Sequence, residues 1–126
     1  MISVKEINHR DFKVCFQLDA NAICLWSQKQ WDDEFKKKGT KVYGLSKSNL
    51  VIGVCVFQVV LDEAQINYFA INQKFRQKGF GGCLMDFVIN KCEKLNLKKM
   101  LLEVSDNNLA ATKLYSKFEF RTVGIR

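Results

Sequence analysis

The chain has 126 residues, 48% of them hydrophobic, and its 20 Lys and Arg against 13 Asp and Glu give a formal net charge of +7. This length predicts one domain that buries its own core and needs neither disulfides nor a metal to fold. The five cysteines are odd in number and form no C-x-x-C pair, which argues against a disulfide framework or a zinc site. We expect them to be reduced and mostly buried.

The N-terminal sequence MISVKEINHRDF is polar from its fifth residue, and no run approaches the roughly 18 apolar residues that span a bilayer. These features predict a soluble, cytoplasmic protein without a membrane partner. The positive charge could favour nucleic acid or a polyanionic cofactor, yet the cations are spread along the chain, with KKK at 36–38 the densest run. A solvated lysine-rich surface is the simpler interpretation, so nucleic acid is not an expected partner.

The first half of the chain predicts one strand, two helices and a three-stranded meander. Residues 2–7 alternate apolar and polar positions like a strand, and residues 11–23 have helical spacing. Ser27 and Gln30 have the form of a capping box that opens a second helix, which Gly39 can end. The three predicted strands are residues 41–47, 50–60 and 64–71, with turns at Ser48 and Asn49 and at Asp62 and Glu63.

The second half predicts strand, loop, helix, strand, helix and strand. A helix follows RQKGFGG at 76–82, and residues 98–104, 108–118 and 120–125 have the patterns of a strand, a short helix and a last strand. With no internal repeat, linker or proline, one mixed α/β layer structure is the economical prediction. The unit from residues 64–71 to residues 98–104 should be a right-handed parallel crossover.

The segment RQKGFGG is the strongest candidate for a binding site. A loop that runs into a helix leaves the first backbone N–H groups of the helix without partners, and they direct positive partial charge at whatever lies there. The glycines allow unusual dihedral angles and close approach to a bound group, while the Arg and the Lys add charge. An anion such as phosphate fits, although a flexible turn would also explain the glycines.

Two nucleotide-binding patterns do not match this segment. The chain has no G-x-x-x-x-G-K-[ST], and G-x-G-x-x-G fails because Gly79 and Gly81 are followed at the third position by Leu84. The pattern that remains is R-x-x-G-x-G, from Arg76 to Gly81.

This pattern, opening a helix after a strand, resembles the acetyl-coenzyme A pyrophosphate loop of the GNAT superfamily of N-acetyltransferases. LEVSDNNLAATKLY at 102–115 is similar to the L-E-V-x-x-x-N-x-x-A-x-x-L-Y stretch of its ribosomal-protein-alanine, or RimI-like, branch. LWSQKQWDDEF, QVVLDEA and FRTVGIR resemble the W-S segment, the hairpin of the third and fourth strands and the closing G-x-R segment of that branch. The matches run from about Trp26 to Arg126 in an unbroken order.

The resemblance implies an α/β GNAT fold over residues 1–126, with a mixed central sheet of about six strands flanked by about four helices. Chains of this branch continue after G-x-R into a seventh strand that inserts between the fifth and the sixth, and this sequence stops at Arg126. We therefore expect the strand at 98–104 to keep an unpaired edge. Other departures are Gln73 in place of a proline, Ser105 in place of an arginine and Glu119 in place of a glycine.

The resemblance also implies a cofactor and a set of site residues. Acetyl-CoA would be the acetyl donor, with no metal; the loop would cradle its pyrophosphate and a splayed fourth strand would bind its pantetheine arm. The implied cofactor-binding residues are Phe69, Ala70, Ile71, Arg76, Gln77, Lys78, Gly79, Phe80, Gly81, Gly82 and Asn108. Glu103 matches the general base of the branch and Tyr115 its general acid.

The expected function is acetyl transfer to a primary amine, in the first place the N-terminal alanine of a small-subunit ribosomal protein, by direct attack on the thioester. A cysteine-based covalent route is disfavoured because Cys83 and Cys92 lie on a helix expected to pack against the sheet and the only histidine, His9, is far away in sequence. Three alternatives stay open: the same chemistry on a small-molecule amine, a catalytically silent domain that binds coenzyme A or a partner, and a basic RNA-binding module. The sequence leaves the oligomeric state undefined.

Overall fold

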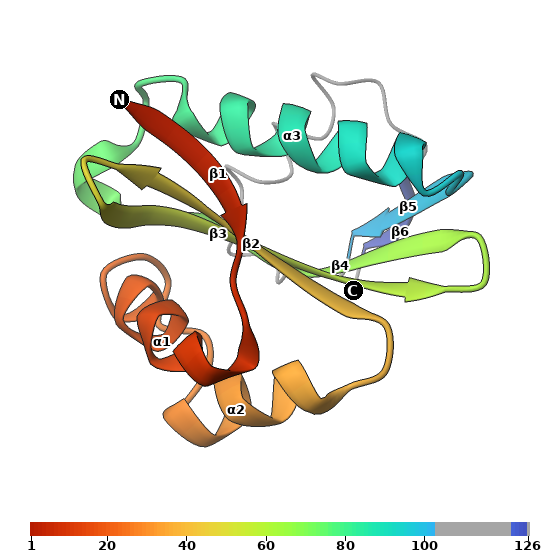
Figure 1. Ribbon diagram of the computed structural model, residues 1–126, viewed down its shortest axis with the longest axis horizontal. Coiled ribbons are helices and arrows are strands. Elements are labelled where there is room, and N and C mark those ends of the chain that lie inside the picture. Colours follow the sequence, from red (N-terminus) through yellow and green to blue (C-terminus); the bar gives the residue numbers. More distant parts are fainter. Residues whose placement is uncertain (103–121, 126) are drawn as a thin grey trace.

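The computed structural model describes residues 1–102 and 122–125 of the chain (Figure 1). Its six-stranded sheet has the order β1-β2-β3-β4-β5-β6. The strands are β1 (Ile2–Glu6), β2 (Thr40–Lys47), β3 (Leu50–Val60), β4 (Glu63–Ile71), β5 (Lys99–Leu102) and β6 (Thr122–Ile125). The helices are α1 (Phe12–Ala20), α2 (Gln28–Lys36) and α3 (Phe80–Lys94), with 3-10 turns at His9–Asp11 and Gln73–Phe75.

The elements form three layers, with α3 on one face of the sheet and α1 and α2 on the other (Figure 1). Strands β1, β2, β3 and β4 pair with one another in antiparallel order, whereas β4 with β5 and β5 with β6 pair in parallel. The predicted mixed α/β sheet of about six strands is confirmed. The predicted fourth helix, at 108–118, lies outside the described residues. No helix of the described part is long and apolar enough to cross a membrane.

Local sequence signals determine several element ends. Ser27 Oγ accepts from the Gln30 backbone N–H at 3.1 Å and Gln30 Oε1 accepts from the Ser27 N–H at 2.7 Å, which is the predicted capping box. Helix α2 ends at Lys36, before Gly39, so Gly39 is not its cap. Instead Gly39 has φ +82° and its carbonyl accepts from the Val59 N–H at 2.9 Å, so it makes the turn into β2.

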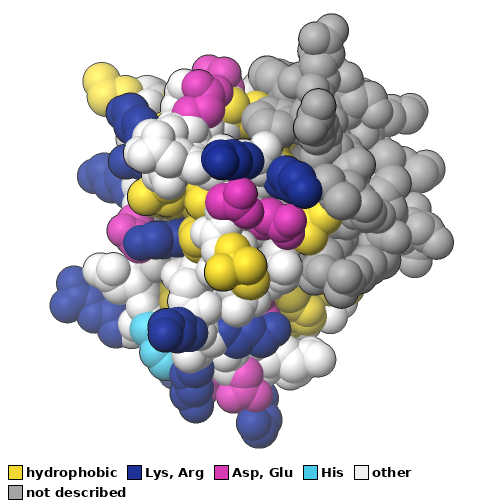
Figure 2. Space-filling view, turned by 90° about the vertical axis from the view of Figure 1, so that its right-hand side faces the viewer, with side chains coloured by type: hydrophobic (Ala, Val, Ile, Leu, Met, Phe, Trp, Pro, Cys, Tyr) yellow, Lys and Arg dark blue, Asp and Glu magenta, His cyan; other side chains and the backbone are white. Residues whose placement is uncertain are grey.

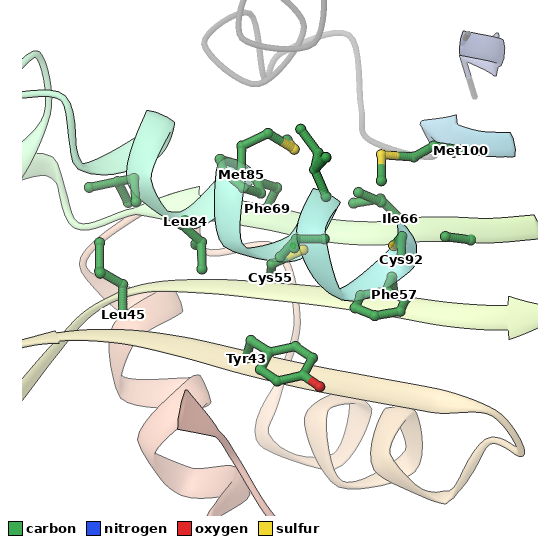
Figure 3. Close-up of a cluster of buried hydrophobic side chains, with 14 of the residues drawn as sticks. Tyr43, Leu45, Cys55, Phe57, Ile66, Phe69, Leu84, Met85, Cys92 and Met100 are labelled. Carbon is green, nitrogen blue, oxygen red and sulfur yellow. The ribbon is translucent and has the colours of Figure 1, made fainter. Parts of the chain in front are cut away.

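The core between α3 and the sheet contains residues from β2, β3, β4, β5 and α3 (Figure 3). Its fully buried members include Leu45, Phe57, Ile66, Leu84 and Met85. These side chains come from β2, β3, β4 and α3, so the helix that follows the glycine-rich segment is fixed against the centre of the sheet.

Strand β4 contains a β-bulge at Asn67. Val56 of β3 pairs with Tyr68, and the next residue of β3, Phe57, pairs with Ile66. Asn67 is therefore an extra residue of β4 with no residue of β3 opposite it. Because strand side chains alternate between faces, the extra residue turns Tyr68 toward α1 and α2 although Ile66 faces α3.

Tyr68 meets a buried carboxylate on the α1 and α2 face. Asp19 is 1% exposed, and its oxygens accept from the Tyr68 hydroxyl at 2.8 Å and the Trp31 indole N–H at 3.2 Å. They also accept from the backbone N–H groups of Leu25 at 3.0 Å and Trp26 at 2.9 Å. Burial, and then the Asp19 charge, raise the pKa of Tyr68 above its ordinary value, so the phenol stays a donor.

The expected unpaired edge on the fifth strand is wrong. Strand β6 lies directly beside β5 in parallel, with Met100 opposite Thr122 and Leu102 opposite Ile125. A strand edge that keeps unpaired N–H and C=O groups is costly, and β6 covers this edge of β5 at those two positions.

All five cysteines are free thiols. Cys15, Cys55 and Cys92 are buried, while Cys24 and Cys83 are exposed, so the expectation of reduced and mostly buried cysteines is confirmed. Burial raises the pKa of Cys15 to about 12 and that of Cys92 to about 11, which keeps both as neutral thiols at neutral pH.

Asp19→Ala should destabilise the protein strongly, because it leaves buried donors without an acceptor. We expect a loss of about 3 kcal/mol or more in the free energy of unfolding, and about 2 kcal/mol for Tyr68→Phe, which removes one donor to a charged acceptor. Urea unfolding followed by tryptophan fluorescence measures both, since the two tryptophans, Trp26 and Trp31, contact the Tyr68 ring. A loss below 1 kcal/mol for Asp19→Ala would contradict this account.

Candidate functional site

The β4–α3 loop, residues 72–79, begins with a turn that is anchored to the sheet. The Asn72 N–H donates to the Ile52 carbonyl at 2.7 Å, and the Asn72 side chain accepts from the Lys74 N–H at 2.9 Å. The Phe75 N–H donates to the Asn72 carbonyl at 2.9 Å. The start of the loop is therefore fixed relative to β3.

The second half of the loop uses left-handed backbone at two positions. Gly79, the N-cap of α3, has φ +85° and Gln77 has φ +61°. The sequence indicated the first position through its glycine. It gave no signal for the second, where a side chain in this region costs about 1–3 kcal/mol and is typical of ligand-binding backbone.

In the described part of the chain, the first turn of α3 has backbone N–H groups outside the helical hydrogen bonds and open space beside two glycines. The first intrahelical bond runs from the Cys83 N–H to the Gly79 carbonyl at 3.2 Å, so the N–H groups of Phe80, Gly81 and Gly82 precede the helical ladder. At Gly79 and at Gly82, the described part of the chain places no atom within 4 Å of where a Cβ would stand. A side chain at either position would therefore not clash with the described part of the protein. The space beside these glycines could hold a bound group.

The two cations predicted for this site have different surroundings. Arg76 is half-buried, with Nε donating to the Ile71 carbonyl and Nη2 to the Ala22 carbonyl, both at 3.1 Å. Lys78 is exposed, and its Nζ lies 5.9 Å from the centroid of the Phe75 ring. Of the two, Lys78 has its charge at the surface of the loop.

The predicted pantetheine-binding residues lie at the end of β4 that leads into the loop. Phe69, Ala70 and Ile71 are buried and pair with β3 on one side. On the other side, the described part of β5 pairs with β4 only from Glu63 to Ile66. Strand β4 thus extends past the described end of β5 toward the N-terminus of α3.

The predicted catalytic residues Glu103 and Tyr115 and the predicted cofactor contact Asn108 lie outside the described residues. In the chain, Glu103 directly follows Leu102, the last residue of β5, which pairs with Ile66 of β4. Their roles remain predictions. Within the described ranges, no group of three or more His, Cys, Asp or Glu side chains could hold a metal ion.

The face of the molecule in Figure 2 carries charges of both signs on its described surface. Lys and Arg side chains are interspersed there with Asp and Glu, and form no continuous basic stripe. On α2, Lys29 and Lys36 form ion pairs with Asp33 at 3.0 and 3.7 Å. The described charges on this face are therefore mixed, and the expectation that nucleic acid is not a partner stays a prediction.

The fold and the loop agree with what comparisons with known proteins find. The model of the acetyltransferase (GNAT) family matches residues 2–120. The ribosomal protein bS18-alanine N-acetyltransferase of Escherichia coli K12 is 25% identical over 127 residues, which cover 100% of this chain and 85% of the relative. This relative confirms the resemblance to the ribosomal-protein-alanine branch.

Solved structures show the same fold. The crystal structure of a ribosomal-protein-alanine N-acetyltransferase from Escherichia coli aligns with a TM-score of 0.85 at 24% identity, over 94% of this chain and 77% of that chain. A GNAT family acetyltransferase from Elizabethkingia anophelis, solved with acetyl-CoA bound, aligns with a TM-score of 0.74 at 22% identity, over 95% and 76% of the two chains. The chain belongs to the acetyltransferase (GNAT) family and is an acetyl-CoA-dependent N-acetyltransferase.

Proposed function

We propose that this protein acetylates the N-terminal alanine of a small-subunit ribosomal protein in the cytoplasm. The observation that carries the proposal is its similarity along the whole chain to an enzyme named for that reaction. Ribosomal proteins are present where ribosomes assemble, which supports the location. The geometry at the start of α3 supports the donor, because unpaired N–H groups at a helix N-terminus favour phosphate groups.

The chain's own groups divide the binding of the donor between backbone and side chain. The N–H groups of Phe80, Gly81 and Gly82 are available to the pyrophosphate, and the exposed charge of Lys78 adds to their attraction. The end of β4, which leads into this loop and extends past the described end of β5, would align the pantetheine arm. When bound, acetyl-CoA supplies a thioester carbonyl that an amine can attack.

Proton transfer is assigned to two side chains. Glu103, directly or through a water molecule, accepts a proton from the acceptor ammonium, since only the neutral amine is a nucleophile. Tyr115, with an ordinary pKa of about 10, donates to the departing sulfur, whose reference pKa is about 8.5 if it behaves like Cys. A backbone N–H between Phe69 and Ile71 polarises the thioester carbonyl, and the loss of such a donor typically raises a barrier by about 3 kcal/mol.

The acceptor can be tested with peptides. Purified protein is incubated with acetyl-CoA and synthetic peptides that carry the N-terminus of a small-subunit ribosomal protein beginning with alanine, and acetylation is located by mass spectrometry. We expect acetyl on the α-amine, and none on the same peptide with a blocked N-terminus. Thiol release only with small amines such as polyamines would overturn the acceptor, and binding of acetyl-CoA without any thiol release would indicate a silent domain.

The catalytic roles predict distinct pH profiles. Glu103→Gln should lower kcat by about 10²-fold or more, because general-base catalysis contributes 10²–10⁴-fold, and should remove the acidic limb of the kcat profile. Tyr115→Phe should lower kcat and leave the KM for acetyl-CoA unchanged. Full acetyl transfer by both variants across pH would show that the roles are wrongly assigned.

Gly82→Ala should have opposite effects on stability and binding. Alanine is favoured over glycine in a helix by up to about 1 kcal/mol, and no described atom obstructs its Cβ, so the free protein should melt at a higher temperature. The same methyl group should weaken coenzyme A binding about tenfold by blocking the pyrophosphate. Asn90→Ala, at an exposed position of α3, is the matched control that should stabilise without changing affinity. Unchanged affinity in Gly82→Ala would place the pyrophosphate elsewhere.

A further inference from the structure

The β4–α3 loop is joined to the segment that connects α1 and α2, residues 21–27. Gln73 Nε2 and Arg76 Nη2 both donate to the Ala22 carbonyl, each at 3.1 Å. The Gln73 N–H donates to the Asn21 carbonyl at 2.9 Å. Because Arg76 Nε also donates to the Ile71 carbonyl at 3.1 Å, one guanidinium connects the end of β4, the β4–α3 loop and the α1–α2 segment.

The α1–α2 segment is itself firmly held. Its N–H groups at Leu25 and Trp26 donate to the buried Asp19 carboxylate, and those at Ala22 and Cys24 donate to the Asp19 carbonyl at 3.0 and 2.8 Å. Ala22 is 4% exposed. The carbonyl that Gln73 and Arg76 share is therefore a fixed point of the fold.

The bonds made by Gln73 and Arg76 come immediately before the strained part of the loop. Gln77 follows Arg76 and has φ +61°, and Gly79 at φ +85° then leads into α3. A left-handed non-glycine residue persists only where its surroundings hold the backbone in place. The anchored side chains at Gln73 and Arg76 supply that restraint, and the restrained backbone presents the N–H groups of the first turn of α3.

We propose that Arg76 and Gln73 are positioning residues for acetyl-CoA: they fix the β4–α3 loop through the carbonyls of Ala22 and Ile71, and the Arg76 guanidinium does not hold the pyrophosphate itself. The proposal rests on acetyl-CoA binding at the N-terminus of α3. It assigns the recognition of the pyrophosphate to backbone N–H groups and Lys78.

The two roles differ in what a lysine at position 76 can do. An arginine that binds phosphate directly acts largely through its charge, which lysine keeps although it loses the bidentate geometry. The bridging role needs two donors in a planar fork that reach separate carbonyls, and an ammonium lacks this geometry. Arg76→Lys should therefore behave like Arg76→Gln if the side chain positions the loop.

The test is the dissociation constant of coenzyme A, measured by calorimetry at low and high salt, together with the melting temperature of each free protein. We expect Arg76→Gln and Arg76→Lys to weaken binding alike, by about tenfold, and equally at both salt concentrations. Gln73→Ala should weaken it less, and the double variant Gln73→Ala/Arg76→Gln should lose less than the product of the single effects, because both side chains act on one carbonyl. Lys78→Gln is the comparison, with a loss that shrinks as salt screens its charge.

Three results would overturn the proposal. Near-normal affinity in Arg76→Lys with a salt-dependent loss in Arg76→Gln would make Arg76 a direct phosphate ligand. A lower melting temperature with unchanged affinity in Arg76→Lys and Gln73→Ala would leave only a structural role. Failure of the unchanged protein to bind coenzyme A would overturn the site itself, and is distinguished from the other two because no variant is needed to see it.

Discussion

The buried carboxylate of Asp19 is the interaction on which the arrangement of the candidate site depends. A buried charge is tolerated only where its oxygens accept hydrogen bonds, and this one accepts from the α1–α2 segment, from Trp31 of α2 and from Tyr68 of β4. The carboxylate thereby joins the helical layer to the strand that runs into the β4–α3 loop. Because the α1–α2 segment also carries the carbonyl that Gln73 and Arg76 contact, the position of the loop depends on the same buried group.

The β-bulge at Asn67 makes this arrangement possible. In a regular strand Tyr68 would face the same side as Ile66, toward α3, and Asp19 would lose its phenol donor. The bulge has its own support on the helical face, since the Asn67 amide donates to Glu34 Oε2 at 3.0 Å and Lys37 Nζ lies 2.8 Å from Glu34 Oε1. Two buried acidic side chains, Asp19 and Glu34, are thus each satisfied by a residue at the bulge or next to it.

The sequence could predict those parts of the fold that depend on interactions between residues close together in the chain. The capping box at Ser27 and the turn at Ser48 and Asn49, with φ of +51° and +68°, depend on neighbours within three residues. Asp19 could not be identified in this way, because its partner Tyr68 is 49 residues away. The prediction for the edge of β5 failed because it depended on which strand would come next to it, and β6 takes that place directly. Of the candidate site, the glycine loop and its place before α3 followed from the sequence, while the left-handed Gln77 did not.

The residues of the glycine-rich motif have different structural roles. From the sequence alone, the glycines were expected to share one role and the two cations another. Gly79 is needed for its dihedral angle, at φ +85°, whereas Gly82 has ordinary helical backbone and leaves space outside the helix. Arg76 carries a full positive charge, as Lys78 does, yet its guanidinium donates to two backbone carbonyl oxygens, which carry only partial charge. The net charge of +7 is therefore a poor guide to how this site attracts an anion. In the proposed site the attraction would come mainly from backbone N–H groups whose direction is set in the folded chain, so that a pyrophosphate would meet donors that are already aligned.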